Sequence, residues 1–269
     1  MFIPKAGKDP SSPGSYRPLM LLSTIGKLYE RCLMQRILDP LDAWCPLHPK
    51  QFGFHQALGT EDCIHAVIDC LEERRQEYYL TAMTLLDIKG AFDHVLWPHV
   101  IAELSSRVPW YLCCAIEVYF TEHLIMGDGT HFQPLEHGVP QGSVLAPLLW
   151  NVGYDIVLKT LDSEMIEASC YTDDTLLVAS APSLKGLRTE VRCQINVVSE
   201  LLDVCGLESN ISTTGILLMD RTRRLRPRAE SYPTQLPTFN VNGTTITPAK
   251  VINYLGVWVD SRLAWKEHI

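Results

Sequence analysis

Three aspartates in the sequence have the type and the surroundings that metal-dependent phosphoryl transfer requires. Asp87 lies at the end of the apolar run LTAMTLLDI at 80–88, and the adjacent Asp173 and Asp174 precede another apolar run. Neighbouring carboxylates repel one another and raise each other's pKa unless a cation offsets their charge. Hard oxygen ligands suit Mg²⁺, and a pair of such ions is the usual device for nucleotidyl transfer. The three carboxylates are therefore candidate ligands for magnesium.

A purely structural role for the same residues stays open at this point. Asp is common in turns, so Asp173 and Asp174 could simply form one, and Asp87 could cap the end of a strand. Composition and periodicity do not decide between the two readings.

The surrounding pattern predicts the elements that must position these aspartates. Residues 80–88 are expected to form a strand, and residues 166–180 to form a β-hairpin around the acidic turn. Helical periodicity predicts five helices, which span 23–44, 60–78, 92–104, 143–161 and the stretch from Leu187 to Cys205. Further strand-like segments occur near 215–219, 238–246 and 251–259. Because strands and helices intermix without strict βαβ alternation, the expected fold class is α+β.

Length and composition exclude several classes of protein. The chain has 269 residues, 46% of them hydrophobic, which is enough to bury a core and excludes a disordered or fibrous chain. It holds neither a secretory h-region nor an apolar run long enough to cross a bilayer, so we expect an intracellular protein without a membrane partner. The net charge of −8 argues against a wide nucleic-acid interface. Nine cysteines without a C-x-x-C pair predict free thiols.

Three strings, in a fixed order, resemble the core motifs of one family. They are LDIKGAFD at 86–93, GVPQGS at 138–143 and YTDD at 171–174. Flanking strings agree with them: IPKAGK and YRPLMLLSTIGKLYE within 3–30, QFGF at 51–54 and YLGVWVD at 254–260. Together they resemble the reverse transcriptases of non-long-terminal-repeat (LINE-like) retrotransposons, over essentially the whole chain.

The resemblance implies a right-hand polymerase fold with an antiparallel palm sheet. Residues 1–80 would be mainly fingers and residues 81–269 mainly palm. The thumb is expected to be missing, and the chain to be a reverse transcriptase domain truncated at both ends.

The resemblance also implies roles for the acidic residues. Asp87 and Asp173 would hold two Mg²⁺ ions with help from the main-chain carbonyl of Ile88, and Asp174 would be a weaker or supporting ligand. The implied activity is RNA-directed DNA polymerisation, with an RNA template, a DNA primer and deoxynucleoside triphosphates as partners. The family copies RNA at a nuclear target, which allows a nuclear location.

Further residues acquire roles by the same resemblance. Arg17, with Lys5 or Lys8, would grip the triphosphate of the incoming nucleotide. Phe92 would be the aromatic gate that rejects a 2′-hydroxyl, and Gln141 would touch the nucleotide or the template. The expected primer and template contacts are Gly142, Tyr171 and Thr172.

The sequence departs clearly from the family pattern at two positions, and YTDD in place of the family's YADD is a mild change. Thr213 stands where the family usually has a lysine that protonates the leaving pyrophosphate, and His55 replaces an arginine. One alternative is therefore a catalytically silent remnant with a palm fold and at most weak RNA binding. Another is a viral-type RNA-dependent RNA polymerase, which Phe92 argues against because RNA synthesis needs a site that accepts the 2′-hydroxyl.

Overall fold

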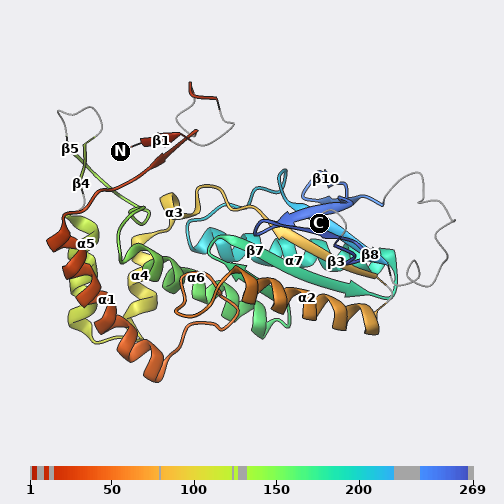
Figure 1. Cartoon of the computed structure of the whole chain (residues 1–269), viewed down its shortest axis with the longest axis horizontal. Helices are drawn as coiled ribbons and strands as arrows, with labels where there is room; N and C mark the ends of the chain where they lie inside the picture. Colours follow the sequence, from red (N-terminus) through yellow and green to blue (C-terminus); the bar gives the residue numbers. More distant parts are fainter. Residues whose placement is uncertain are drawn as a thin grey trace. The chain divides into compact units, whose positions relative to one another are not determined.

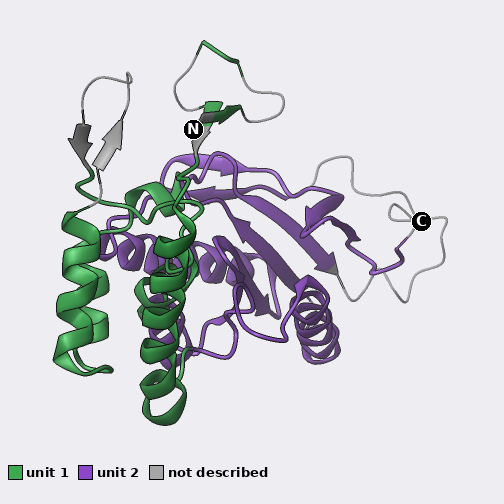
Figure 2. Cartoon of the chain, turned by 60° about the vertical axis from the view of Figure 1, so that its left-hand side comes forward, with its two compact units in different colours: residues 1–47, 90–156 green, residues 48–89, 157–269 purple. Residues whose placement is uncertain are grey.

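The chain is divided into two compact units, which are described separately below (Figure 2). The computed structural model describes residues 2–4, 9–11, 15–78, 80–122, 124–126, 132–220 and 237–265. Unit 1 contains residues 1–47 and 90–156, and unit 2 contains residues 48–89 and 157–269.

Unit 2 is built on a four-stranded antiparallel sheet with the strand order β6-β7-β3-β8 (Figure 1). Its strands are β3 (Leu80–Leu86), β6 (Glu167–Tyr171), β7 (Asp174–Ala181) and β8 (Gly215–Asp220). β6 and β7 form a tight hairpin in which Tyr171 pairs with Asp174. The predicted strand over 80–88, the predicted acidic hairpin and the α+β fold class are therefore confirmed.

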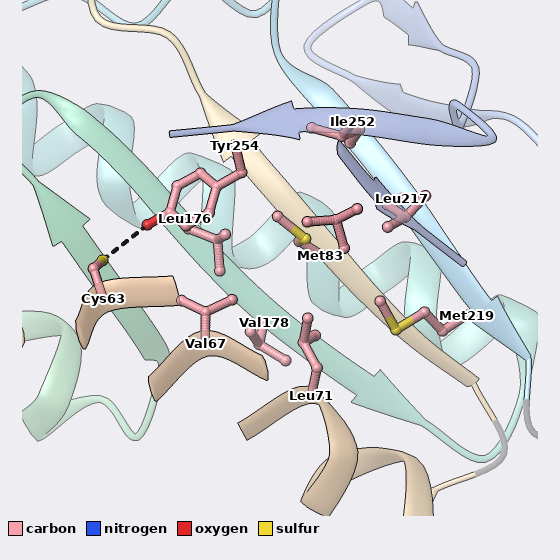
Figure 3. Close-up of a cluster of buried hydrophobic side chains, with 11 residues drawn as sticks. Cys63, Val67, Leu71, Met83, Leu176, Val178, Leu217, Met219, Ile252 and Tyr254 are labelled. Atoms are coloured by element: carbon pink, nitrogen blue, oxygen red, sulfur yellow. Dashed lines mark hydrogen bonds between the residues drawn. The ribbon is translucent and has the colours of Figure 1, made fainter. Parts of the chain in front are cut away.

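Helices cover both faces of this sheet. α2 (Thr60–Glu77) packs on one face, where the Cys63 thiol and the Tyr254 hydroxyl lie 3.1 Å apart (Figure 3). Side chains alternate between the two faces along a strand, and residues that point to the other face, such as Ala82 and Leu177, are buried as well. α7 (Leu184–Val204) packs against β7 and β3. The α2-side core consists of Cys63, Val67, Leu71, Met83, Leu176, Val178, Leu217, Met219, Ile252, Tyr254 and Val259.

Two small hairpins complete the described part of unit 2. β9 (Phe239–Val241) pairs with β10 (Thr244–Ile246), and β11 (Val251–Tyr254) pairs with β12 (Val257–Asp260). The second hairpin is tied to the sheet by a bond of 2.8 Å from the Ala249 amide to the Ile216 carbonyl. The predicted strand-like segments near 238–246 and 251–259 are thus hairpins rather than single strands.

Unit 1 is mainly helical. The strands among its described residues pair as two short hairpins, β1 (Phe2–Pro4) with β2 (Tyr16–Pro18), and β4 (Leu124–Met126) with β5 (Phe132–Pro134). Its helices are α1 (Thr24–Trp44), α3 (Ala91–His94), α4 (Trp97–Ser105), α5 (Trp110–Thr121) and most of α6 (Ala146–Ser163). No helix among the described residues is both long and apolar enough to cross a membrane.

One local prediction is wrong. The helix expected over 92–104 is split into α3 and α4, because the chain leaves the helical conformation at Val95 and Leu96 and Pro98 lies in the first turn of the second helix. α2 begins at Thr60 as predicted, and the Asp62 carboxylate accepts a bond of 2.7 Å from the Gly59 amide. α5 and the strands β1, β2, β4 and β5 were not predicted.

Candidate active site

The three aspartates meet at one end of the unit 2 sheet. Leu86 pairs with Thr175 in the β3–β7 register, so the next position places Asp87 opposite Asp174. Directly opposed residues on antiparallel strands have Cβ atoms about 4.5–5.5 Å apart. Asp173 occupies the turn immediately before β7. Strand pairing therefore gathers carboxylates that are 86 and 87 positions apart in the chain.

Electrostatics shows that these carboxylates act on one another. Partial burial, together with the negative charges of Asp173 and Asp87, raises the pKa of Asp174 to about 6, although the residue as a whole is exposed. Mutual repulsion of this kind is relieved when a cation binds between the groups. The site thus favours a positive charge.

The Asp87 carboxylate is held by two side chains from the segment before β8. The Thr213 hydroxyl donates a bond of 2.5 Å to Oδ2, and the Asn210 side-chain amide donates one of 3.3 Å to the same oxygen. The main-chain carbonyl of Asp87 also accepts a bond of 2.7 Å from the Asn210 amide. Thr213, at the position where a lysine was expected, is therefore beside the candidate metal ligand.

Ile88 has a backbone arrangement that suits its expected role. It forms an isolated antiparallel bridge with Ser209, in which the bonds are made by the Asp87 carbonyl and by the Lys89 amide. In antiparallel pairing, the main-chain polar groups of successive residues point alternately toward and away from the partner strand. The carbonyl of Ile88 therefore points away from Ser209. The side chain of Ile88 is buried.

The hairpin turn that carries Asp173 has an unusual backbone. Thr172 has a φ of 60°, in the left-handed region, and its hydroxyl donates a bond of 2.8 Å to Asp173 Oδ1. Tyr171, before the turn, packs against the α2-side core. The side chain of Gln51 contacts this turn, a role that the sequence analysis did not assign to it.

The donor set fits magnesium, although the carboxylates are not arranged as a complete cage. No group of three or more His, Cys, Asp or Glu residues within the described ranges is placed to hold a metal ion. Mg²⁺ is usually held by one or two carboxylates plus water and substrate phosphates, so such a cage is not needed. Carboxylate and carbonyl oxygens at Asp87, Asp173 and Ile88 are ligands of the required kind.

Within unit 1, Phe92 and Gln141 line the same small pocket of about 120 Å³. The Gln141 amide donates a bond of 2.9 Å to the Asp93 carboxylate. The centroid of the Phe92 ring lies 4.9 Å from that of the buried Trp150 ring. The Trp150 ring in turn stacks on the Tyr154 ring, with 5.3 Å between the centroids. The structure therefore brings together two of the five residues that were expected to bind the nucleotide.

The loop that carries Gln141 is fixed to α3 by main-chain contacts. The Val139 amide donates a bond of 2.7 Å to the Phe92 carbonyl, and the Gly138 amide donates one of 2.8 Å to Val95. Gly142 has a φ of +102°, and a Cβ there would lie 2.6 Å from the Met20 carbonyl oxygen. This close approach requires glycine, so the position is explained by packing within unit 1.

The remaining predicted nucleotide ligands are basic residues near the N-terminus. Arg17 lies in β2, where it pairs with Ile3. Lys5 and Lys8 lie outside the described residues.

Comparisons with known proteins place the chain among reverse transcriptases. The family model "Reverse transcriptase (RNA-dependent DNA polymerase)" matches residues 3–259. The RNA-directed DNA polymerase from mobile element jockey of Drosophila melanogaster is 26% identical over 100% of this chain and 29% of that protein. The putative 115 kDa protein in type-1 retrotransposable element R1DM of the same species is 28% identical over 97% of this chain and 24% of that protein. The chain thus spans less than a third of these relatives.

Solved structures agree on the fold. Telomerase from Candida tropicalis, in complex with a fragment of telomeric RNA, has a TM-score of 0.57 at 12% identity, with 88% of this chain and 36% of that chain covered. Its apo form truncated from the C-terminal domain gives a TM-score of 0.55 at 11% identity, with 88% and 44% covered. The predicted right-hand polymerase fold and the family resemblance are confirmed.

Proposed function

Because this chain belongs to the reverse transcriptase family, with relatives among the non-LTR retrotransposons, we propose that it performs RNA-directed DNA synthesis. The observation that carries the proposal is the meeting of Asp87, Asp173 and Asp174 at one end of the sheet. The substrates are a primer 3′ end, an RNA template and deoxynucleoside triphosphates. An intracellular and nuclear location is proposed on the same family grounds.

The family uses divalent metal ions, and we assign two Mg²⁺ to this site. Asp87 and Asp173, with the carbonyl of Ile88, are the proposed ligands, and Asp174 supports them. Bound ions of this kind would supply activation of the primer 3′-hydroxyl for attack on the α-phosphate and neutralisation of the pyrophosphate leaving group.

The chain's own residues position the reactants in this proposal. Phe92 excludes the 2′-hydroxyl of a ribonucleotide, since its ring is backed by Trp150 and cannot retreat without displacing a buried side chain. Gln141, held by Asp93, presents its amide to the nucleotide or the template.

Three further groups would complete the binding surfaces. Arg17 offers a bidentate fork to the triphosphate, and Lys5 or Lys8 adds a point charge. Gly142, Tyr171 and Thr172 are the proposed neighbours of the primer and template.

Primer extension on an RNA template with Mg²⁺ tests the proposal directly. At low salt, where phosphate contacts contribute most, the wild type should extend the primer and Asp173→Ala should not. Asp203→Ala, which removes an exposed carboxylate from α7, is the matched control and should extend like the wild type. Extension that survives Asp173→Ala would overturn the assignment of the site.

One observation favours a second candidate, a catalytically silent remnant that keeps the palm fold. Thr213 stands at the position of the family's lysine and donates its hydroxyl to Asp87. It provides no cationic acid for the leaving pyrophosphate. Absence of extension by a folded wild-type protein would favour this reading.

A further inference from the structure

The turn between β6 and β7 holds a residue in a conformation that its side chain disfavours. Thr172 has a φ of 60°, and a side chain branched at Cβ rarely adopts the left-handed region. Such a conformation persists only where the surrounding structure enforces it, and it occurs preferentially at functional sites. Asp173 follows Thr172 directly, so the direction of its carboxylate depends on how this peptide is held.

Gln51 provides the enforcing contacts. Its Oε1 accepts a bond of 3.1 Å from the Thr172 amide, and its Nε2 donates one of 3.3 Å to the Thr172 carbonyl. One side-chain amide thus engages both main-chain polar groups of the left-handed residue. Gln51 is 2% exposed, so water is not available to replace either bond.

The segment around Gln51 is itself fixed to the edge of the sheet. The Phe52 amide donates a bond of 2.8 Å to the Cys170 carbonyl, and the Cys170 amide donates one of 2.8 Å to Lys50. Residues 50–52 therefore run alongside β6 in a parallel bridge. The amide of Gln51 reaches the turn from a rigid strand edge and not from a free loop.

Close packing at Gly53 reinforces the contact. A Cβ at this position would lie 2.4 Å from the Thr172 amide nitrogen, so the turn rests directly on the backbone of the segment. The Gly53 amide also donates a bond of 3.2 Å to Gln51 Oε1, which orients the side chain.

We infer that Gln51 is a positioning residue for the acidic turn: it holds Thr172 in the left-handed conformation and thereby fixes the direction of Asp173 and Asp174. The inference rests on the proposed function, because it gives Gln51 its role through the proposed metal ligands. Gln51 itself touches no reacting group in this account.

The first test needs no activity. Gln51→Met keeps the length of the side chain and removes both hydrogen-bonding groups, and hydrogen exchange is then measured at the Thr172 amide. We expect exchange about tenfold faster than in the wild type, with the β3 amides unchanged. Gln194→Met is the matched control, because Gln194 is also buried in unit 2 but bonds to Val178 and Glu190. Equal exchange at Thr172 in the two variants would overturn the inference.

The second test uses a double-mutant cycle in the primer-extension assay. Gln51→Met should lower the rate by about 10²-fold, since a small displacement of a catalytic group has an effect of this size. When Thr172→Gly is already present, Gln51→Met should lower the rate by a smaller factor, because glycine adopts a positive φ without help. Equal factors in the two backgrounds would mean that Gln51 does not act through the conformation of Thr172.

The two tests separate the inference from the proposed function. An inactive wild type would contradict the proposed function, and the exchange experiment would still decide whether Gln51 holds the turn. An active wild type with unchanged exchange in Gln51→Met would contradict the inference alone.

Discussion

The hydroxyl of Thr213 donates a hydrogen bond of 2.5 Å to the carboxylate of Asp87, and the two residues are separated by 126 positions in the chain. The bond orients the carboxylate of Asp87, together with the weaker bond of 3.3 Å that the Asn210 side chain donates to the same oxygen. Thr213 is neutral, however, and cannot act as a cationic acid toward a leaving group. The residue therefore supports the candidate metal ligand without replacing the function expected of a lysine.

A cationic side chain at this position should raise the rate of primer extension. Thr213→Lys restores a proton donor beside the phosphates, and general-acid catalysis typically contributes about 10²–10⁴-fold. We expect an increase of at least about tenfold, which is below this range because the lysine must also find the right orientation. Thr213→Met, which adds length without charge, is the control. An equal response of both variants would show that charge at position 213 has no role.

The sequence was informative where local pattern determines structure. The apolar run before Asp87 predicted β3, and the apolar residues on either side of the acidic turn predicted the β6–β7 hairpin. The break between α3 and α4 was missed although Pro98 marks a helix start, because the apolar residues on both sides fit one helical period.

The hydrogen bonds that hold the acidic turn could not be predicted from the sequence, for a different reason. Gln51 and Thr172 are 121 positions apart, and the partner atoms on Thr172 belong to the main chain. Main-chain partners have no residue type, so no pattern of side chains predicts them. The string QFGF was recognised as a motif, but the role of its glutamine became visible only once the turn was placed beside it.

Gly53→Ala should damage the acidic turn. The added methyl group would lie 2.4 Å from the Thr172 amide nitrogen, a main-chain atom that cannot move without shifting the turn. Overpacking of this kind costs typically about 1–3 kcal/mol, so the free energy of unfolding should fall by that amount in a denaturant titration. At Gly59 a Cβ would meet its nearest atom at 3.7 Å, and the φ of −122° is ordinary, so Gly59→Ala is the matched control. Equal losses in the two variants would contradict the close approach.

The stability of the metal-free protein should fall as the pH rises from about 4 to about 6. The pKa of Asp174 is raised from 3.8 to about 6 in the folded state, so folding favours the protonated carboxyl. Its contribution to stability is therefore present below pH 4 and is lost as the pH rises through 6. Because the residue is exposed and its charge is screened, the change should not exceed about 1 kcal/mol.

Chemical denaturation at several pH values, with and without Mg²⁺, measures this effect. Asp174→Asn should remove the fall in stability, and Mg²⁺ should reduce it by offsetting the repulsion from Asp87 and Asp173. A fall of the same size in Asp174→Asn would assign the pH dependence to another group.

Phe92 should determine the choice of sugar. Phe92 lines the pocket that Gln141 also lines, and the centroid of its ring lies 4.9 Å from that of the buried Trp150 ring, which limits its movement. Phe92→Ala should raise the use of ribonucleotides relative to deoxyribonucleotides by about 10²-fold, because the space for a 2′-hydroxyl is then open. Phe92→Tyr retains the ring and should retain the discrimination. The ratio of the two kcat/KM values in primer extension measures it, and a ratio unchanged in Phe92→Ala would remove Phe92 from the nucleotide site.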